Sequence, residues 1–393
     1  MSQPTPVLSL AILQRVCTSY RLELFRRLAA REDLRVQVFI GDDLPDSKVR
    51  STSDFGDLDV VKLPTRWMRV GGRVVPWHRG LAGALRDFDP DVILSEGESH
   101  FLGFLTAARV RSQRAGRRLV HWGLGGLPGD DPEARLVNRL KRPLQSLADA
   151  FLLYSSFGRD VMVRIGHPAE KIVVAVNVSD TERHCASADA LAATRSEARR
   201  ELGLPDRFTV VSVGALDANK RPDVLIDAVA AMDPARVGVM LVGGGAELER
   251  LRASVRDRAI ENVLLTGPVP PTELARYYRA ADVLALPGRG GMVISEAMCH
   301  RLPVIVHLAD GTEYDLVREG ETGVRLETGS AASFREAIEA LAADPERAAR
   351  MGESGRQLVE SRFSMSAMVD RVVEACRVAR GQRVVAEDAT PSS

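Results

Sequence analysis

Short apolar runs alternate with longer amphipathic stretches along almost the whole 393-residue chain. Short apolar runs between turn residues are typical of buried strands, and amphipathic stretches are typical of helices. Ten runs predict strands, in two series. The first series is Val7–Leu13, Arg35–Ile40, Val92–Leu94, Leu119–Trp122 and Ala150–Tyr154, and the second is Thr209–Gly214, Gly238–Val242, Val263–Leu265, Val283–Leu286 and Val304–Val306.

Amphipathic stretches between these strands predict helices. They lie at Tyr20–Ala30, Val224–Met232, Ala246–Ala259 and Thr272–Ala280, and further helices follow at Ala331–Ala343, Glu346–Ser361 and Met365–Ala379. Strands that alternate with helices indicate parallel sheets with both faces covered. The pattern therefore predicts an α/β fold with two Rossmann-like, doubly wound domains and a cleft between them.

The chain is longer than one hydrophobic core usually serves, which also favours two domains. The stretch before Asp206 is polar, lacks strand character and ends in Leu202-Gly203-Leu204-Pro205, a helix stop followed by proline. We expect an N-terminal domain at 1–180, a linker at 181–206, a C-terminal domain at 207–362, a helix at 363–380 that returns to the N-terminal domain, and a flexible tail at 381–393.

Composition excludes some classes of protein. The 53 basic and 53 acidic residues cancel, which argues against a dedicated nucleic-acid binder. Arginines gather at 109–118 and 135–142, either as solvated helix faces or as a surface for an anionic acceptor or membrane headgroups. The four cysteines are widely spaced, which fits a reducing cytoplasm. We expect a cytoplasmic monomer or homodimer whose membrane contact is at most peripheral.

The most informative segment runs from Ala281 to Val306. An apolar run ends at Pro287, and Gly288, Gly290 and Gly291 follow before a helical stretch that carries Glu296. A glycine turn at a helix N-terminus presents free backbone N–H groups to an anion such as a diphosphate. A carboxylate one turn further on suits a neighbouring hydroxyl, so the segment suggests a nucleotide-sugar site.

Two other segments follow predicted strands. Lys220 comes after the strand ending at Gly214, in the crevice where open α/β sheets bind ligands, which favours a phosphate-binding role over a solvated lysine. Gly243-Gly244-Gly245 follows the strand Gly238–Val242 and indicates either a tight turn or a backbone that approaches a ligand.

Five segments, in order, resemble the retaining GT-B glycosyltransferases of family 4. They are 213–228, 241–252, 263–288, 294–306 and 310–324, and the N-terminal half matches more loosely at 19–30 and 89–94. The resemblance implies a UDP- or GDP-sugar donor, an acceptor and no required metal. The proposed function is transfer of the sugar to a hydroxyl of an envelope glycan or a secondary metabolite. A nucleotide-sugar epimerase or hydrolase and a non-catalytic partner protein stay open as alternatives.

The resemblance also assigns roles to donor-site residues. Lys220 matches the catalytic lysine at the diphosphate, Val269 the position that reads the base, Glu296 the glutamate that holds the ribose, and Gly290, Gly291 and Met292 the loop at the phosphates and sugar; Gly244 joins this set. His121 resembles the catalytic histidine that faces the donor sugar, with a hydrogen-bonded structural histidine as the alternative.

Two positions depart from the family pattern. Gly288 stands where a sugar-binding glutamate is usual, and Ala215 stands where many members have an arginine. Arg221 or Arg289 could replace that arginine, so both are candidates for the donor site. On the acceptor side the candidates are Tyr20, Glu96, Glu98 and Gly123, and Arg15 to Tyr20 replaces the usual glycine-rich loop.

Overall fold

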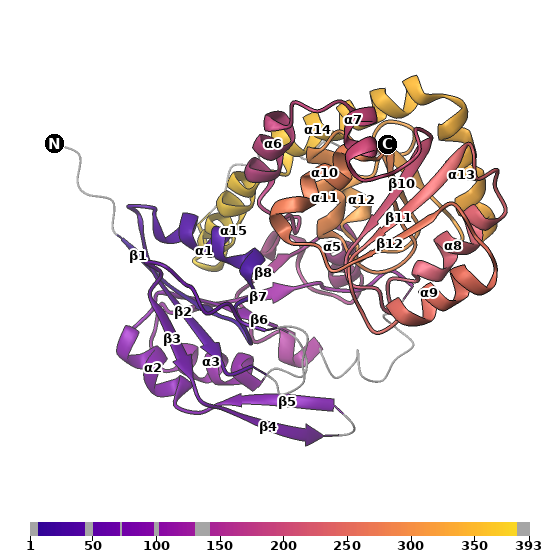
Figure 1. The fold of residues 1–393 in the computed structure, drawn as a ribbon. Coiled ribbons are helices and arrows are strands. Elements are labelled where there is room, and N and C mark those ends of the chain that lie inside the picture. Colours follow the sequence, from indigo (N-terminus) through magenta and orange to yellow (C-terminus); the bar gives the residue numbers. More distant parts are fainter. Residues whose placement is uncertain (1–6, 44–49, 71–72, 98–101, 130–141, 383–393) are drawn as a thin grey trace.

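The computed structural model describes residues 7–43, 50–70, 73–97, 102–129 and 142–382, and it contains two parallel sheets covered by helices (Figure 1). The N-terminal sheet has the order β3-β2-β1-β6-β7-β8-β9. Its strands are β1 (Leu8–Leu13), β2 (Leu34–Gly41), β3 (Val60–Leu63), β6 (Val92–Glu96), β7 (Arg118–Gly123), β8 (Ala150–Leu153) and β9 (Ile172–Val174). The helices of this half are α1 (Ser19–Ala29), α2 (Leu81–Phe88), α3 (Leu102–Ser112) and α5 (Ser156–Arg164).

The C-terminal sheet has the order β12-β11-β10-β13-β14-β15. Its strands are β10 (Phe208–Val213), β11 (Val237–Val242), β12 (Val263–Gly267), β13 (Val283–Leu286), β14 (Val304–Val306) and β15 (Gly323–Arg325). The later helices are α6 (Thr181–Ala190), α7 (Arg195–Glu201), α8 (Pro222–Ala230), α9 (Leu248–Asp257), α10 (Leu274–Ala280), α11 (Met292–Cys299), α12 (Glu313–Leu316), α13 (Ala331–Ala343), α14 (Pro345–Arg362) and α15 (Met365–Ala379).

The strand order confirms the predicted doubly wound fold in both halves. All the strand pairs within the two sheets are parallel, and the order reverses between β1 and β6 and again between β10 and β13. In such sheets ligands bind in the crevice beyond the carboxyl ends of the strands at the reversal. Each half of the molecule therefore contains one strand reversal, the place where sheets of this kind bind ligands.

Several elements differ from the sequence-based expectation. The range predicted as a linker contains two helices, α6 and α7, and Thr194 and Glu197 form a reciprocal capping box at the start of α7. A Thr-x-x-Glu pattern is a signal for a helix start that the polar composition obscured. The antiparallel hairpin of β4 (Thr65–Val70) and β5 (Arg73–His78) and the short strands β3, β9 and β15 were also not predicted.

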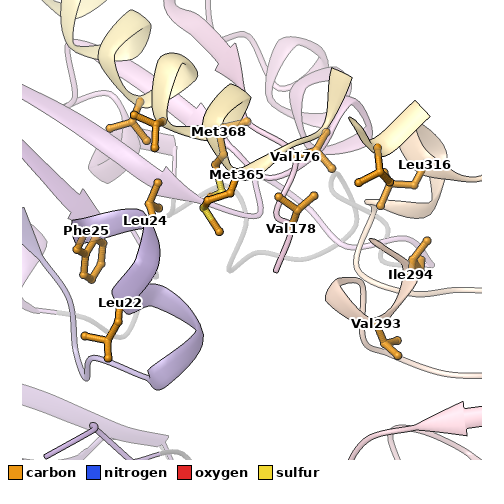
Figure 2. Close-up of a cluster of buried hydrophobic side chains, with 14 of the residues drawn as sticks. Leu22, Leu24, Phe25, Val176, Val178, Val293, Ile294, Leu316, Met365 and Met368 are labelled. Carbon is orange, nitrogen blue, oxygen red and sulfur yellow. The ribbon is translucent and has the colours of Figure 1, made fainter. Parts of the chain in front are cut away.

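The C-terminal helix α15 packs beside α1 on the N-terminal sheet, where it contacts β7, β8 and β9 (Figure 1). Its methionines join one continuous core with α1 and with the crossing segment after β9 (Figure 2). That core includes Met365 and Met368 of α15, Phe25 of α1 and Val178 of the crossing segment. Burial of these side chains stabilises the segments of the chain that cross between its two halves.

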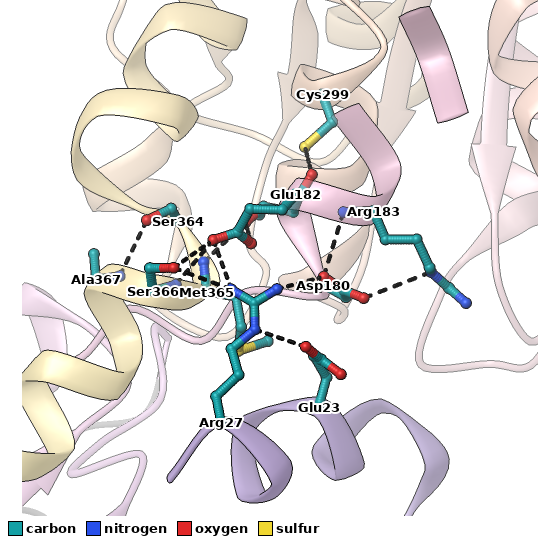
Figure 3. A network of polar contacts seen from close by, with 11 residues as sticks. Glu23, Arg27, Asp180, Glu182, Arg183, Cys299, Ser364, Met365, Ser366 and Ala367 are labelled. Carbon is teal, nitrogen blue, oxygen red and sulfur yellow. Dashed lines mark hydrogen bonds and ion pairs between the residues drawn. The ribbon is translucent and has the colours of Figure 1, made fainter. Parts of the chain in front are cut away.

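Polar contacts hold the two crossings of the chain together (Figure 3). Arg27 of α1 donates to Glu182 at 2.8 Å, and the same carboxylate oxygen of Glu182 accepts from the Ser366 backbone N–H at 3.0 Å. The Thr181 hydroxyl accepts from the Met365 N–H at 2.9 Å. These bonds fix the start of α6 against the start of α15, beside α1.

Candidate active site

The loops that follow β10 and β13 meet at the strand reversal of the C-terminal sheet. The Arg289 N–H donates to the Asn219 carbonyl at 3.0 Å. A Cβ on Gly288 would collide with the backbone of Asn219 and Lys220. Close backbone packing therefore requires glycine at 288, and it leaves no space for the glutamate that the family resemblance implies at this position.

The Lys220 ammonium lies directly against Gly290. A Cβ on Gly290 would clash with the Lys220 Nζ, and Gly290 has a φ of +140°, which favours glycine. Burial lowers the pKa of Lys220, and the carboxylates of Asp217, Asp310 and Glu296 oppose that shift. The structure thus brings together a desolvated ammonium and the glycine loop, as predicted from their positions at two strand ends.

The Asp310 carboxylate follows β14 and reaches the same loop. Its Oδ2 accepts from the Gly291 N–H at 3.1 Å, and its Oδ1 accepts from the Thr312 hydroxyl at 2.7 Å. Met292, the first residue of α11, is half-buried. The N-cap residue of α11 is Gly291, which has no side chain to cap the helix. A partial positive charge at the start of α11 therefore faces a carboxylate in this structure.

Glu296 lies one turn into α11, at the end of a chain of aromatic and imidazole groups. The Tyr278 hydroxyl donates to Glu296 Oε2 at 2.9 Å, and His184 Nε2 lies 3.9 Å from Glu296 Oε1. Tyr278 is fully buried and stacks on His300 with ring centroids 4.8 Å apart. Burial, together with the Glu296 charge, raises the pKa of Tyr278, so the phenol remains a hydrogen-bond donor to the carboxylate.

The Gly243–Gly245 turn packs against the protein's own backbone. A Cβ on Gly243 would meet the Gly214 carbonyl, and a Cβ on Gly245 would meet the backbone of Leu216. The Gly244 carbonyl accepts from the Leu216 N–H at 2.9 Å. Of the two interpretations of this glycine run, a tight turn against a neighbouring loop accounts for all three residues.

The other donor-site candidates surround this crevice with differing exposure. Ala215 and Arg289 are exposed, while Val269 is half-buried and packs on the core behind β12. Arg221 is the exposed N-cap of α8 with a φ of +50°, and its guanidinium lies close to Gly329. The contacts of Arg221 therefore direct its guanidinium toward the segment after β15.

The acceptor candidates lie at the carboxyl edge of the N-terminal sheet. Glu96 ends β6, and its Oε2 accepts from the Arg15 N–H at 2.9 Å, which ties the loop after β1 to the loop after β6. Gly123 ends β7 and is buried, and Tyr20 is 42% exposed on the first turn of α1. Glu98 lies outside the described residues.

His121 is buried inside the N-terminal half. Its side chain is 3% exposed and lies between the rings of Phe104 and Phe151, with ring centroids 5.6 Å away in each case. Its Nε2 is 3.1 Å from the Gly97 carbonyl, and a Cβ on Gly97 would collide with the imidazole. These contacts favour the structural interpretation of His121, which supports the backbone directly after β6.

Residues that sequence reasoning missed include Asp310, Tyr278 and His184. Asp310 could have been found from the sequence, because it follows β14 at the same edge of the sheet as the loops after β10 and β13. Glu313, which resembles an acidic family position, is 1% exposed and accepts from the N–H groups of Ala309 and Gly311 at 3.0 and 2.8 Å. Glu313 therefore shapes the turn before α12.

Two general features of the described residues bear on what they bind. They contain no cluster of three or more His, Cys, Asp or Glu side chains with the geometry of a metal site. Within the same ranges, no helix combines the length and the apolar character that crossing a bilayer requires.

The two doubly wound halves define the GT-B class of fold, and comparison with solved structures agrees. The structure of Anabaena Alr3699/HepE in complex with UDP and glucose matches with a TM-score of 0.69 at 19% identity, over 93% of this chain and 98% of that chain. WaaG, a glycosyltransferase involved in lipopolysaccharide biosynthesis, matches with a TM-score of 0.64 at 14% identity, over 95% of this chain and all of that chain. At these identities the likeness establishes the fold.

Family models make the assignment more specific. The model for glycosyl transferases group 1 matches residues 194–358, and the model for the glycosyl transferase 4-like domain matches residues 17–177. The two ranges cover most of the chain. The protein belongs to the group 1 glycosyltransferases of the GT-B class, which confirms the resemblance found in the sequence.

Curated relatives match a shorter part. D-inositol 3-phosphate glycosyltransferase of Corynebacterium aurimucosum is 31% identical over 57% of this chain and 56% of the relative. GDP-mannose-dependent alpha-(1-6)-phosphatidylinositol monomannoside mannosyltransferase of Mycolicibacterium smegmatis is 34% identical over 45% of this chain and 48% of the relative. The chain thus spans about half the length of the curated relatives that it matches.

Proposed function

We propose that this protein is a retaining glycosyltransferase that moves a sugar from a nucleoside-diphosphate sugar to a hydroxyl of an acceptor. One observation carries the proposal. Lys220, the glycine loop with Gly290 and Gly291, and Glu296 converge at the strand reversal between β10 and β13. The arrangement offers an ammonium for a diphosphate and a carboxylate for ribose hydroxyls in the crevice where this fold binds ligands.

The proposed chemistry depends on stabilising the departing nucleoside diphosphate. Negative charge develops on the diphosphate as the glycosidic bond breaks, and Lys220 supplies an oriented positive charge with no reorganisation at that moment. In the proposal Glu296 holds the ribose, Tyr278 fixes Glu296, and Val269 lies beside the base. Transfer proceeds with retention and without a metal ion, as the resemblance implies.

The relatives suggest which substrates to test. A relative in Mycolicibacterium smegmatis is named for GDP-mannose and phosphatidylinositol monomannoside, and relatives in Corynebacterium are named for D-inositol 3-phosphate. Two neighbouring structures contain UDP and UDP-glucose respectively. We therefore propose a UDP- or GDP-sugar donor and a polyol or glycan acceptor. The acceptor would bind the N-terminal domain, 1–180, and the donor the C-terminal domain, 207–362, in a cytoplasmic enzyme.

Thermal shift and transfer assays test the proposal. UDP, GDP and their sugars should raise the melting temperature, since a ligand at 100 times its Kd stabilises by about 2.7 kcal/mol. The variant Lys220→Ala should lower kcat by roughly 10²-fold or more, as loss of a charge-stabilising group does. Lys171→Ala, at an exposed lysine of the N-terminal half, is the matched control and should keep full activity.

Three results would contradict the proposal. Unchanged turnover in Lys220→Ala would refute the site. Donor consumption that proceeds equally without any acceptor would indicate an epimerase or a hydrolase. Absence of a melting shift with every nucleotide would indicate a non-catalytic protein of the same fold.

A further inference from the structure

Arg21 of α1 is a buried cation that has no carboxylate partner among the described residues. Its side chain is 7% exposed, and it donates to Asn177 Oδ1 at 3.0 Å and to the Tyr154 hydroxyl at 2.8 Å. The guanidinium carbon lies 4.6 Å from the centroid of the Trp122 ring. Other arginines that are almost fully buried in the described ranges, such as Arg199, contact carboxylates. A desolvated guanidinium whose hydrogen-bond partners are all neutral is a costly arrangement.

Two buried polar atoms beside Arg21 also lack partners within the described part of the chain. One is the hydroxyl oxygen of Thr18, a residue that is 9% exposed, and the other is the indole nitrogen of Trp122, whose side chain is fully buried. Buried polar groups in native proteins are nearly always hydrogen-bonded, so an unpaired group calls for an explanation. Both atoms belong to residues that surround the first turn of α1.

Thr18 is also the N-cap residue of α1, a helix of 11 residues, and its side chain caps no backbone N–H. The first turn contains no acidic residue, so the positive end of the helix dipole is not neutralised there. The turn follows the loop after β1, at the strand reversal of the N-terminal sheet. This is the second of the two strand reversals at which the fold places ligands.

We propose that Arg21, the Thr18 hydroxyl and the N-terminus of α1 form a binding site for a phosphate group of the acceptor. This inference rests on the proposed glycosyl transfer, because it names the acceptor class of that reaction. A phosphate supplies the negatively charged partner that Arg21 lacks. Its oxygens accept hydrogen bonds from the uncapped backbone amides at the start of α1 and from the Thr18 hydroxyl. The ring centroid of Tyr20, a residue that is 42% exposed, lies 5.3 Å from the Arg21 guanidinium carbon.

The guanidinium has capacity for this ligand. Arginine has five N–H donors, and the described residues accept from only two of them, through Asn177 and Tyr154. The remaining donors can form the paired contacts that guanidinium groups make with phosphate. The phosphate can belong to a free polyol monophosphate or to a phosphoinositide headgroup, which have the same recognition chemistry.

Isothermal titration calorimetry on the full chain tests the site. The probes are inorganic phosphate, D-inositol 3-phosphate, myo-inositol and phosphatidylcholine vesicles with or without phosphatidylinositol. The wild-type protein should bind D-inositol 3-phosphate or the phosphatidylinositol vesicles at least tenfold more tightly than myo-inositol or plain vesicles. Binding of D-inositol 3-phosphate would identify a free polyol phosphate as the source, and binding of the phosphatidylinositol vesicles would identify a lipid headgroup.

Matched variants locate the binding. Arg21→Gln should weaken binding of the phosphate probe at least tenfold, whereas Arg26→Gln, at an exposed arginine of the same helix, should leave it unchanged. If Arg21→Gln fails to fold, Arg21→Lys keeps the charge but loses the paired geometry, and it should weaken binding severalfold. Thr18→Val should weaken binding while the melting temperature of the free protein stays equal or rises, because a buried unpaired hydroxyl is removed.

Equal phosphate affinity in the wild type and Arg21→Gln would overturn the inference, as would the absence of phosphate binding to a wild type that binds UDP. Unchanged affinity in Thr18→Val would also contradict it. UDP binding is measured in every variant. A wild type that binds a phosphate probe but no nucleotide would refute the proposed donor site and leave the Arg21 site standing.

Discussion

Replacement of Gly290 by alanine tests the central geometry of the candidate site. The added Cβ would clash with the Lys220 Nζ, so the ammonium must move. Nothing else in the site is removed, because Gly290 has no side chain and Lys220 remains in the sequence. The variant therefore asks whether the position of the ammonium, and not its presence alone, matters for transfer.

The magnitude follows from electrostatics. To restore ordinary contact with the added Cβ, the ammonium must move by roughly 1.5 Å. With an effective dielectric constant of about 20, a unit charge about 4 Å from a phosphate oxygen contributes about 4 kcal/mol, and at about 5.5 Å about 3 kcal/mol. A displacement of that size costs about 1 kcal/mol of stabilisation of the departing diphosphate, or roughly fivefold in kcat. Because Gly290 has a φ of +140°, alanine also strains the backbone by roughly 1–3 kcal/mol of folding stability.

A control separates strain from displacement. Gly320 also has a positive φ, +71°, but a Cβ there would meet no atom within 4 Å. Gly320→Ala should therefore lose stability and keep kcat, while Gly290→Ala should lose both. Steady-state transfer assays and melting curves on both variants give the comparison.

A double-mutant cycle completes the test. If Gly290→Ala acts only by moving Lys220, then adding it to Lys220→Ala should lower kcat no further. Two results would refute the reasoning: a kcat for Gly290→Ala within twofold of wild type, or a loss that adds in full to that of Lys220→Ala.

Further predictions concern neighbouring groups. Tyr278→Phe removes the hydrogen bond to Glu296 but keeps the stacking on His300; it should raise the donor KM severalfold at constant kcat, and an unchanged KM would show that Glu296 does not depend on Tyr278. Burial raises the pKa of Asp315, which accepts from the Ser156 N–H at 2.9 Å, to about 6. Because this folded-state pKa exceeds the ordinary value of 3.8, its contribution to stability is lost as the pH rises through about 6. Asp315→Asn should therefore stabilise the protein more at pH 8 than at pH 5, with a difference of about 1.4 kcal/mol in the free energy of unfolding, measured from melting curves at the two pH values; equal gains would contradict this. Transfer activity should be the same in excess EDTA as in buffer, and a loss that Mg²⁺ restores would show a metal requirement.

The sequence was sufficient for the fold class because the ten strands that it predicted are apolar runs with recognisable turn residues on both sides. It was also sufficient to bring Lys220 and Gly290 together, since both follow parallel strands whose carboxyl ends share one edge of a sheet. The helices α6 and α7 were missed because their composition is polar, and polar composition is typical of linkers as well. The capping box of Thr194 and Glu197 is the local signal that distinguishes the start of helix α7 from a linker.

The site residues that could not be predicted depend on contacts between distant segments. No pattern near His121 reveals that Phe104 and Phe151 enclose it, so a histidine at a strand end suggested a ligand contact. Likewise, Glu96 followed a strand and suggested an acceptor, although its carboxylate accepts from the Arg15 N–H across the sheet. In both cases the rule about strand ends located the residue correctly but left its partner unknown.

Asp310 shows the same limit within the donor crevice itself. A glycine turn at a helix start indicates free backbone amides, yet the Gly291 N–H already donates to the Asp310 carboxylate at 3.1 Å. That carboxylate also acts on Lys220, where it opposes the lowering of the pKa by burial. A phosphate that uses this amide must therefore replace a negative charge that the protein supplies itself. Sequence reasoning counted the donors to an anion but had no means to find the internal anion that competes for them.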